Sequence, residues 1–419
     1  MARKSVLESP AIGTATNDLI ESCSSPSPPR HAPPPPPKGP VMALAFSGGG
    51  FRATLSALGV LRFMLDAGLG PQIRYVSSVS GGSVANGLFA CSYPAVRDAG
   101  FSVETLDDTV ILPLLRTITS RSLKLHLLEN IWQCVGPNTR TTLLAKTFDS
   151  WFFHGRLLEA LSTEVRFIFN ASNLSTGVRF GFERDEVGDW VMGQIPTSGT
   201  GLHVAEAVAA SAAVPGAFAP VVLKGLDFPC ADGRVPMLLD GGAYDNMGLQ
   251  PLDDLYRAPH GPAHQGEGVC IVALNAGGVF RTGAYGRIPL IRDLQRANSL
   301  LYRQTTALRM SEMVERFQAW EQGGPAAPPA WGRFGVLFGL ATTLKDPTSE
   351  WIEARPEHPE WRLDLAEVRT SFAKFRRRTC ARLLYRGWWL AGATLSRFHR
   401  DLLPPALPTW RAIDGIELT

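Results

Sequence analysis

Two short strand-like segments, each followed by a turn and a helical pattern, constrain the fold most. Residues 41–46 are apolar throughout, without alternation of polar and apolar positions, which is typical of a strand buried on both faces. Residues 73–79 are predicted as a second buried strand. Helices are predicted after them, over 52–66 and 81–90. This order predicts parallel strands joined by right-handed crossovers, and hence an α/β fold with a mainly parallel central sheet flanked by helices.

The remaining pattern continues this mixture of helices and strands. Further strands are predicted at 164–169, 178–182, 236–239 and 269–274, and helices over most of 103–162 and at 204–213, 289–320 and 362–400. The proline-rich stretch 324–360 is expected to be irregular.

The chain divides into a tail and one folded domain. Residues 1–40 are rich in serine and proline and are predicted to be disordered, because such a segment buries too little apolar surface to offset its ordering entropy. Residues 41–419 are predicted to form the domain. Its core motifs lie within 41–310, and 311–419 are expected to form a helical extension.

Charge and cysteine content exclude several classes of function. The formal net charge of +3 gives no reason to expect binding to nucleic acid. The six cysteines are scattered, with no spacing that suits zinc, so we predict reduced thiols in a cytoplasmic protein without metal or cofactor. We expect no signal peptide and no transmembrane helix, because acidic residues interrupt the N-terminal stretch and no apolar run is long enough.

Ser80 lies in a pattern that favours a nucleophile. The strand predicted at 73–79 leads directly into Ser80 and then into a helix, so the serine stands at a tight strand-to-helix turn. Such a turn needs small neighbours; Gly82 provides one, and Ser78 stands where glycine is usual. Serine and glycine also cluster in turns without chemistry, so this pattern alone leaves both interpretations open.

A serine nucleophile needs a base, and an aspartate fits better than a histidine. Asp240 follows a predicted buried strand and precedes two glycines, at the kind of sheet edge where catalytic groups gather. The alternative for Asp240 is a turn without chemistry. The histidines late in the chain follow no recognisable strand and are interpreted as surface residues: His260, His264, His358 and His399.

A glycine run precedes the first predicted helix. Gly48, Gly49 and Gly50 expose backbone N–H groups at the positive end of that helix, where a phosphate or a developing oxyanion can bind. The run is neither a Walker A loop nor a dinucleotide fingerprint. Beside a candidate nucleophile, an oxyanion hole is the better interpretation.

Taken together, these motifs resemble those of patatin-like and cytosolic phospholipase A2-like hydrolases. The resemblance rests on Gly-Gly-Gly-Phe-Arg at 48–52, the Ser80 turn, Asp-Gly-Gly at 240–242 and the alanine- and proline-containing segment 209–220. It covers about 41–310 and implies a three-layer patatin-like fold. It also implies a lipid acyl hydrolase that cleaves carboxylic esters of phospholipids through an acyl-enzyme.

The resemblance also implies roles for individual residues. Ser80 would be the nucleophile and Asp240 the base that activates it. The backbone of Gly48–Gly50 would form the oxyanion hole, with Gly49 and Gly50 as the donors. Arg52 would bind the substrate beside the site. Ser211 would have a structural role.

Substrate and membrane contact remain open in the sequence. The same dyad would serve a thioesterase or a neutral-lipid esterase, and an inactive lipid-binding protein could keep the fold. Basic and aromatic residues alternate over 372–389, which is typical of a helix on an anionic membrane and equally of a helix packed on the core. Packing on the core is the favoured interpretation, and peripheral membrane contact remains an expectation.

Overall fold

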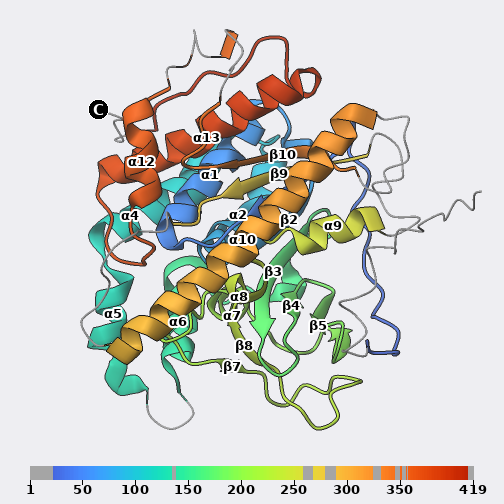
Figure 1. The fold of residues 1–419 in the computed structure, drawn as a ribbon, viewed down its shortest axis with the longest axis vertical. Coiled ribbons are helices and arrows are strands. Elements are labelled where there is room, and N and C mark those ends of the chain that lie inside the picture. Colours follow the sequence, from blue (N-terminus) through green and yellow to red (C-terminus); the bar gives the residue numbers. More distant parts are fainter. Residues whose placement is uncertain are drawn as a thin grey trace, which may run out of the picture.

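The computed structural model describes residues 22–134, 138–257, 268–278, 289–323, 332–344, 350–351, 355 and 357–413. Within them, a ten-stranded sheet forms the centre of the molecule (Figure 1). Its main path runs β10-β9-β1-β2-β3-β4-β5-β6, and β8 pairs with β3 and β7 beside that path. The fold is therefore α/β, as predicted.

One half of the sheet is parallel and the other antiparallel. The parallel strands are β10 (Phe334–Gly339), β9 (Val269–Asn275), β1 (Val41–Phe46), β2 (Ile73–Val79) and β3 (Arg166–Asn173). The antiparallel strands are β4 (Arg179–Phe182), β5 (Glu186–Asp189), β6 (Gly193–Pro196), β7 (Val221–Val222) and β8 (Met237–Asp240). Because β8 is antiparallel to β3, its end at Asp240 pairs with the middle of β3, at Ala171.

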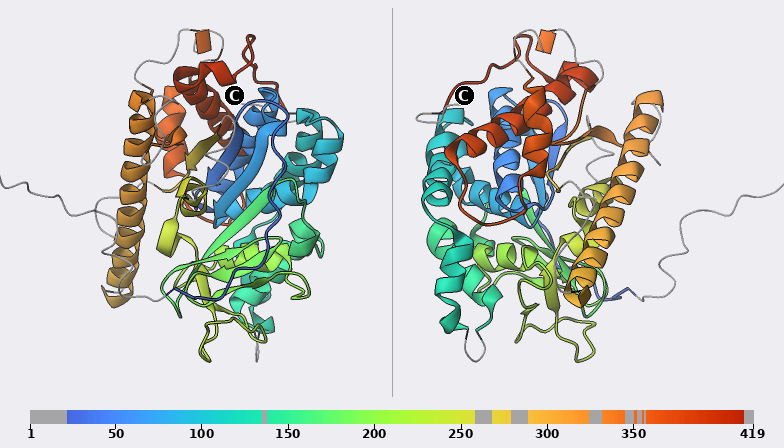
Figure 2. Two further views of the ribbon diagram at one scale, coloured as in Figure 1. Left: turned by 90° about the vertical axis from the view of Figure 1, so that its right-hand side faces the viewer. Right: turned by 60° about the vertical axis from the view of Figure 1, so that its left-hand side comes forward.

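Helices cover both faces of the sheet (Figure 2). The first two are α1 (Gly50–Asp66) and α2 (Gly81–Asp98). The others are α3 (Val103–Leu106), α4 (Leu112–Ser120), α5 (Leu123–Glu129), α6 (Arg140–Phe148), α7 (Val204–Ser211), α8 (Gly242–Asp245), α9 (Gln250–Arg257), α10 (Pro289–Gly323), α12 (Pro359–Glu367) and α13 (Arg377–Phe398).

The two faces of β1 contribute to two separate hydrophobic clusters. Met42, Leu44 and Phe46 pack with α1, α2 and α13 in the larger cluster. Ala43 and Ala45 face the other way, toward α9 and α10. A strand buried on both faces needs apolar residues at every position, which explains the unbroken apolar run at 41–46.

The basic and aromatic helix near the C-terminus packs on the core. Trp388 and Trp389 on α13 are fully buried, and α13 lies against α1 (Figure 1). The guanidinium of Arg386 is also buried; it binds the carbonyl oxygens of Leu340 and Thr342 and forms an ion pair with Glu357. The favoured interpretation of this segment is confirmed, so its aromatic residues are not available to a membrane.

The N-terminal segment differs from the expectation. Residues 1–21 lie outside the described residues, whereas 22–40 run along the surface of the domain in contact with it. Arg74 donates to the carbonyl oxygen of Pro34 at 2.6 Å, and Arg30 forms an ion pair with Glu186 at 2.6 Å. Disorder was therefore the wrong expectation for 22–40, because specific polar contacts replace the missing apolar ones.

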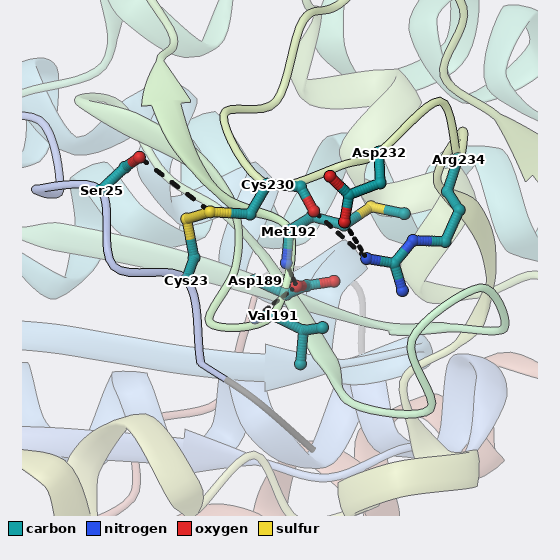
Figure 3. The surroundings of a disulfide bond; sticks show 8 residues. All are labelled: Cys23, Ser25, Asp189, Val191, Met192, Cys230, Asp232 and Arg234. Atoms are coloured by element: carbon teal, nitrogen blue, oxygen red, sulfur yellow. Dashed lines mark hydrogen bonds and ion pairs between the residues drawn. A yellow bond between two sulfur atoms is a disulfide. The ribbon is translucent and has the colours of Figure 1, made fainter.

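A disulfide also fixes this segment (Figure 3). Cys23 is bonded to Cys230, and the Cys23 N–H donates to the carbonyl oxygen of Trp190 at 2.9 Å. The prediction that all cysteines are reduced is wrong for this pair, which lies 207 residues apart in sequence and carries no spacing signal. Disulfides are typical of oxidising compartments, so the cysteines no longer support the cytoplasmic expectation.

Most predicted elements are found, with several differences. Strand β10 lies inside the stretch expected to be irregular, and strands β5, β6 and β7 and helices α8 and α9 were not predicted. Helix α2 extends to Asp98, beyond the predicted end at 90. Across the described ranges, we find no helix with the length and apolar character needed to cross a membrane.

Candidate active site

Ser80 occupies the turn between β2 and α2. Its backbone has φ 52° and ψ −120°, a region that residues with a side chain rarely adopt. Such a conformation costs about 1–3 kcal/mol and persists only where neighbouring structure imposes it. Gly81 allows this, because a β-carbon there would overlap the carbonyl group of Gly50 at the start of α1. The strand-to-helix turn predicted at Ser80 is confirmed.

A network of hydroxyl groups holds the turn. The Ser80 N–H donates to Ser211 Oγ at 2.9 Å, and Ser211 Oγ donates to the carbonyl oxygen of Asn170 at 2.6 Å. Ser83 Oγ lies 2.9 Å from Ser211 Oγ and 3.0 Å from Ser78 Oγ. Ser78 is therefore tolerated where glycine is usual, because its hydroxyl has buried partners.

Asp240 ends β8 and is almost fully buried. Burial raises the pKa of its carboxyl from the ordinary 3.8 to about 6. Hydrogen bonds from the Ser80 side chain and the Gly242 N–H, the latter at 2.8 Å, oppose this rise. The structure thus brings together the two side chains that the sequence singled out. At neutral pH Asp240 is an ionised base beside a serine hydroxyl.

The glycine run lies against the Ser80 turn. Its three N–H groups differ in whether they already have a hydrogen-bond acceptor. The Gly48 N–H donates to the carbonyl oxygen of Asn246 at 3.0 Å, so it is not available to an oxyanion. For the N–H groups of Gly49 and Gly50 no acceptor is found among the described residues. Their φ angles of 152° and 59° favour glycine, and turn the backbone into α1. A β-carbon on Gly48 would lie 2.5 Å from Asn246 Oδ1 and 3.3 Å from Ser80 Cβ, so glycine lets this residue pack against both.

Arg52 does not reach the cavity and has a structural role. Its Nε donates to the carbonyl oxygen of Ala276 at 2.9 Å, Nη2 donates to Thr370 Oγ1 at 3.0 Å, and Nη1 donates to the carbonyl oxygen of Val368. The side chain is 1% exposed, and burial lowers its pKa to about 10, so it stays cationic. The predicted contact with substrate is therefore corrected: Arg52 ties together two segments that border the site.

A cavity of about 670 Å³ opens onto Ser80 and Asp240. One wall is the glycine run, and the opposite wall is one face of α10, which crosses the front of the molecule in Figure 1. The lining residues of α10 are Arg296, Ser299, Tyr302, Arg303, Thr306, Ala307 and Met310. Among the described residues that line the cavity, Asp240 is the sole carboxylate, so the charged groups around it are cationic.

Comparison with known protein families identifies the family of this chain. A family model described as patatin-like phospholipase matches residues 44–253, which is half of the chain. The chain belongs to the patatin-like phospholipase family. The matched region contains Ser80, Asp240 and the glycine run.

Several solved structures match this chain at low sequence identity. Human GIVD cytosolic phospholipase A2 is 15% identical, with a TM-score of 0.46 over 87% of this chain and 63% of that one. The structure of the same enzyme in complex with methyl γ-linolenyl fluorophosphonate and terbium chloride is 14% identical. Its TM-score is 0.49, over 87% of this chain and 59% of that one. VipD from Legionella pneumophila is 15% identical, with a TM-score of 0.32 over 83% of this chain and 67% of that one. This patatin-like chain thus spans under two thirds of the human enzyme, and a search of curated proteins gives no match.

Sequence reasoning missed the α10 wall of this patatin-like site. Its lining residues recur every three or four positions, a spacing that indicates one helix face but not what the face covers. The interpretation as surface residues is wrong for His399, which is buried and contacts the carbonyl oxygen of Gly335. His358 is half-buried and stacks on Trp361, and neither histidine lines the cavity. His260 and His264 lie outside the described residues.

Proposed function

We propose that this protein is a serine lipid acyl hydrolase of the phospholipase A type, which cleaves carboxylic esters through a Ser80–Asp240 dyad. The observation that carries the proposal is the position of the strained Ser80 at the same cavity as the buried carboxylate of Asp240, whose pKa is raised to about 6. A base with that pKa is ionised at neutral pH, yet accepts a proton more readily than an exposed aspartate. Membership of the family supports hydrolysis of a lipid acyl group.

Acylation follows from the positions of these groups. Asp240 accepts the proton of Ser80 Oγ as that oxygen attacks the ester carbonyl carbon. The oxyanion that forms would bind the N–H groups of Gly49 and Gly50 at the start of α1, each worth about 3 kcal/mol in the transition state. Asp240 then gives its proton to the alkoxide oxygen as the carbon–oxygen bond breaks. The alcohol leaves, and the acyl group stays on Ser80.

Deacylation repeats these steps with water. Asp240 takes a proton from a water molecule, whose oxygen attacks the acyl-enzyme. The same two N–H groups bind the second oxyanion. As this intermediate collapses, the bond between the acyl carbon and Ser80 Oγ breaks, Asp240 returns its proton to Oγ, and the carboxylic acid leaves. One carboxylate thus serves both half-reactions, because the leaving alcohol and the incoming water occupy the same place beside it.

Membership of the patatin-like phospholipase family favours a phospholipid over a neutral lipid or a thioester as the substrate.

The proposal is tested with an active-site probe and a lipid panel. Incubation with a fluorophosphonate should label the protein once, and peptide mapping should place the label on Ser80. In the panel, phosphatidylcholine should be cleaved faster than diacylglycerol or an acyl-thioester with the same acyl chains. A folded protein that takes up no label, or takes it up at another residue, would contradict the dyad.

We further propose peripheral membrane contact through the outer face of α10. Leu301 and Leu308 are 61% and 63% exposed and lie on the side of the helix opposite its cavity-lining residues. Apolar side chains exposed on a helix beside a cavity are typical of an interfacial surface.

Replacing Leu301 and Leu308 with glutamate should lower activity on phosphatidylcholine vesicles about tenfold or more, because two charged groups oppose contact with lipid. Hydrolysis of a soluble p-nitrophenyl ester should not change, since neither residue lines the cavity. The matched control is Leu128→Glu on α5, where the leucine is 55% exposed and α5 lies on the other side of the sheet from α10 (Figure 2). An equal loss in that control would assign the lipid surface to α5 instead.

A further inference from the structure

The cavity contains a polar group that the proposed mechanism does not yet use. Tyr302, on the α10 wall, has a buried hydroxyl for which the described part of the chain offers no hydrogen-bond partner. A buried hydroxyl left unpaired costs about 1–3 kcal/mol, so such groups are rare and need an explanation. A hydroxyl that faces a substrate site in the absence of substrate provides one.

The ring of Tyr302 and the carboxylate of Asp240 meet at Gly242. A β-carbon on Gly242 would lie 2.6 Å from Tyr302 Cε1 and 2.9 Å from Asp240 Oδ1. Both atoms therefore face the same point, and any side chain at position 242 would separate them. The charge of Asp240 and burial together raise the pKa of Tyr302, so the phenol keeps its proton and can act as a donor.

Tyr302 lies on the side of the site where Asp240 stands, away from the oxyanion donors of the glycine run. The glycine run provides the oxyanion donors from the start of α1, whereas Tyr302 stands with Asp240. In the proposed mechanism the oxygen that exchanges a proton with Asp240 is the leaving alcohol during acylation and the water during deacylation. Tyr302, whose ring meets Asp240 at Gly242, is therefore placed to contact that oxygen.

We propose that the Tyr302 hydroxyl donates a hydrogen bond to the leaving-group oxygen of the ester, and afterwards to the attacking water. Tyr302 stabilises the negative charge that develops on the oxygen as the carbon–oxygen bond breaks, while the proton that completes the alcohol comes from Asp240. Tyr302 keeps its own proton throughout. The Tyr302 hydroxyl is shielded from solvent, and Ser80 and Asp240 are nearly so.

The test compares leaving groups in Tyr302→Phe and rests on the proposed dyad. With an alkyl ester such as ethyl butyrate, kcat/KM should fall about 10- to 100-fold, the size expected for a hydrogen bond to a charged oxygen. With p-nitrophenyl butyrate it should change little, because p-nitrophenolate leaves without such help. The melting temperature should stay the same or rise, since the variant removes only an unpaired buried hydroxyl.

Tyr93→Phe is the control, because its hydroxyl donates to Glu164 outside the cavity, and it should hydrolyse both esters at the parent rate. An equal fall with both esters, no fall with either, or a lowered melting temperature of Tyr302→Phe would each overturn the role of Tyr302. Fluorophosphonate labelling separates the two proposals. An unlabelled parent contradicts the dyad itself, whereas a labelled parent without leaving-group dependence contradicts Tyr302 alone.

Discussion

Ser80→Ala is expected to lower turnover of phospholipid to the background rate, a loss of about 10³- to 10⁶-fold, because no other group replaces a missing nucleophile. Loss of label from the fluorophosphonate probe should accompany it. Binding to lipid vesicles should remain, since the cavity and the outer face of α10 are untouched. The measurement is initial hydrolysis of phosphatidylcholine, with vesicle co-sedimentation on the same preparation. Residual activity near that of the parent would remove Ser80 from the mechanism.

Ser80→Gly provides a matched comparison that isolates backbone strain. Both variants lose the hydroxyl, and both leave Asp240 without that hydrogen-bond donor. They differ in the β-carbon, which makes φ 52° and ψ −120° unfavourable for alanine but not for glycine. After glycine's extra entropy in the unfolded chain is subtracted, Ser80→Gly should be more stable than Ser80→Ala by roughly 1 kcal/mol. Chemical denaturation measures the difference; equal stabilities would mean that the turn is not strained.

The sequence predicted the parts of this protein that are local in the chain. The β2–Ser80–α2 turn, the glycine run before α1 and the end of β8 at Asp240 each follow from neighbouring residues, and each is found as expected. Their meeting at one place does not follow from parallel strand order alone, because β8, which ends at Asp240, is antiparallel to β3. Predictions of this kind succeed because strand, turn and helix preferences act over a few residues.

The parts that failed depend on contacts between distant residues. Arg52 was expected at the substrate, but carbonyl groups some 220 and 310 residues further along the chain surround its guanidinium. The spacing of Cys23 and Cys230 gave no sign that they form a disulfide. In sequence Gly48 cannot be told apart from Gly49 and Gly50, and only the fold shows that its N–H is bound by the carbonyl oxygen of Asn246. The α10 wall belongs to the same class, because helical spacing at 289–320 does not say which surface the helix covers.

The pH dependence of activity should follow the ionisation of Asp240. The pKa of this carboxyl is raised to about 6, and the mechanism needs its ionised form. We therefore expect kcat/KM to fall tenfold per pH unit below about 6 and to level off above it. An exposed aspartate would place this limb near its ordinary pKa of 3.8 instead. A profile measured with a soluble ester, whose own charge does not change with pH, distinguishes the two.

Asp240→Asn should lower kcat/KM about 10²- to 10⁴-fold and abolish the limb near pH 6, because the amide cannot accept the Ser80 proton. Stability should move the other way. The folded-state pKa of Asp240 lies above the value in the unfolded chain, so its favourable contribution is complete below pH 3.8 and is lost as the pH rises through about 6. Above that pH the buried carboxylate costs up to about 3 kcal/mol, which asparagine avoids while still accepting the Gly242 N–H.

The stability difference between Asp240→Asn and the parent should thus grow in favour of the variant between about pH 4 and 7, measured by thermal unfolding across this range. A variant that is inactive and at least as stable as the parent at pH 8 would locate the loss in the chemistry rather than in the fold. A fully active variant would contradict the dyad. An inactive variant destabilised at every pH would mean instead that Asp240 is needed to hold β8 against the Ser80 turn.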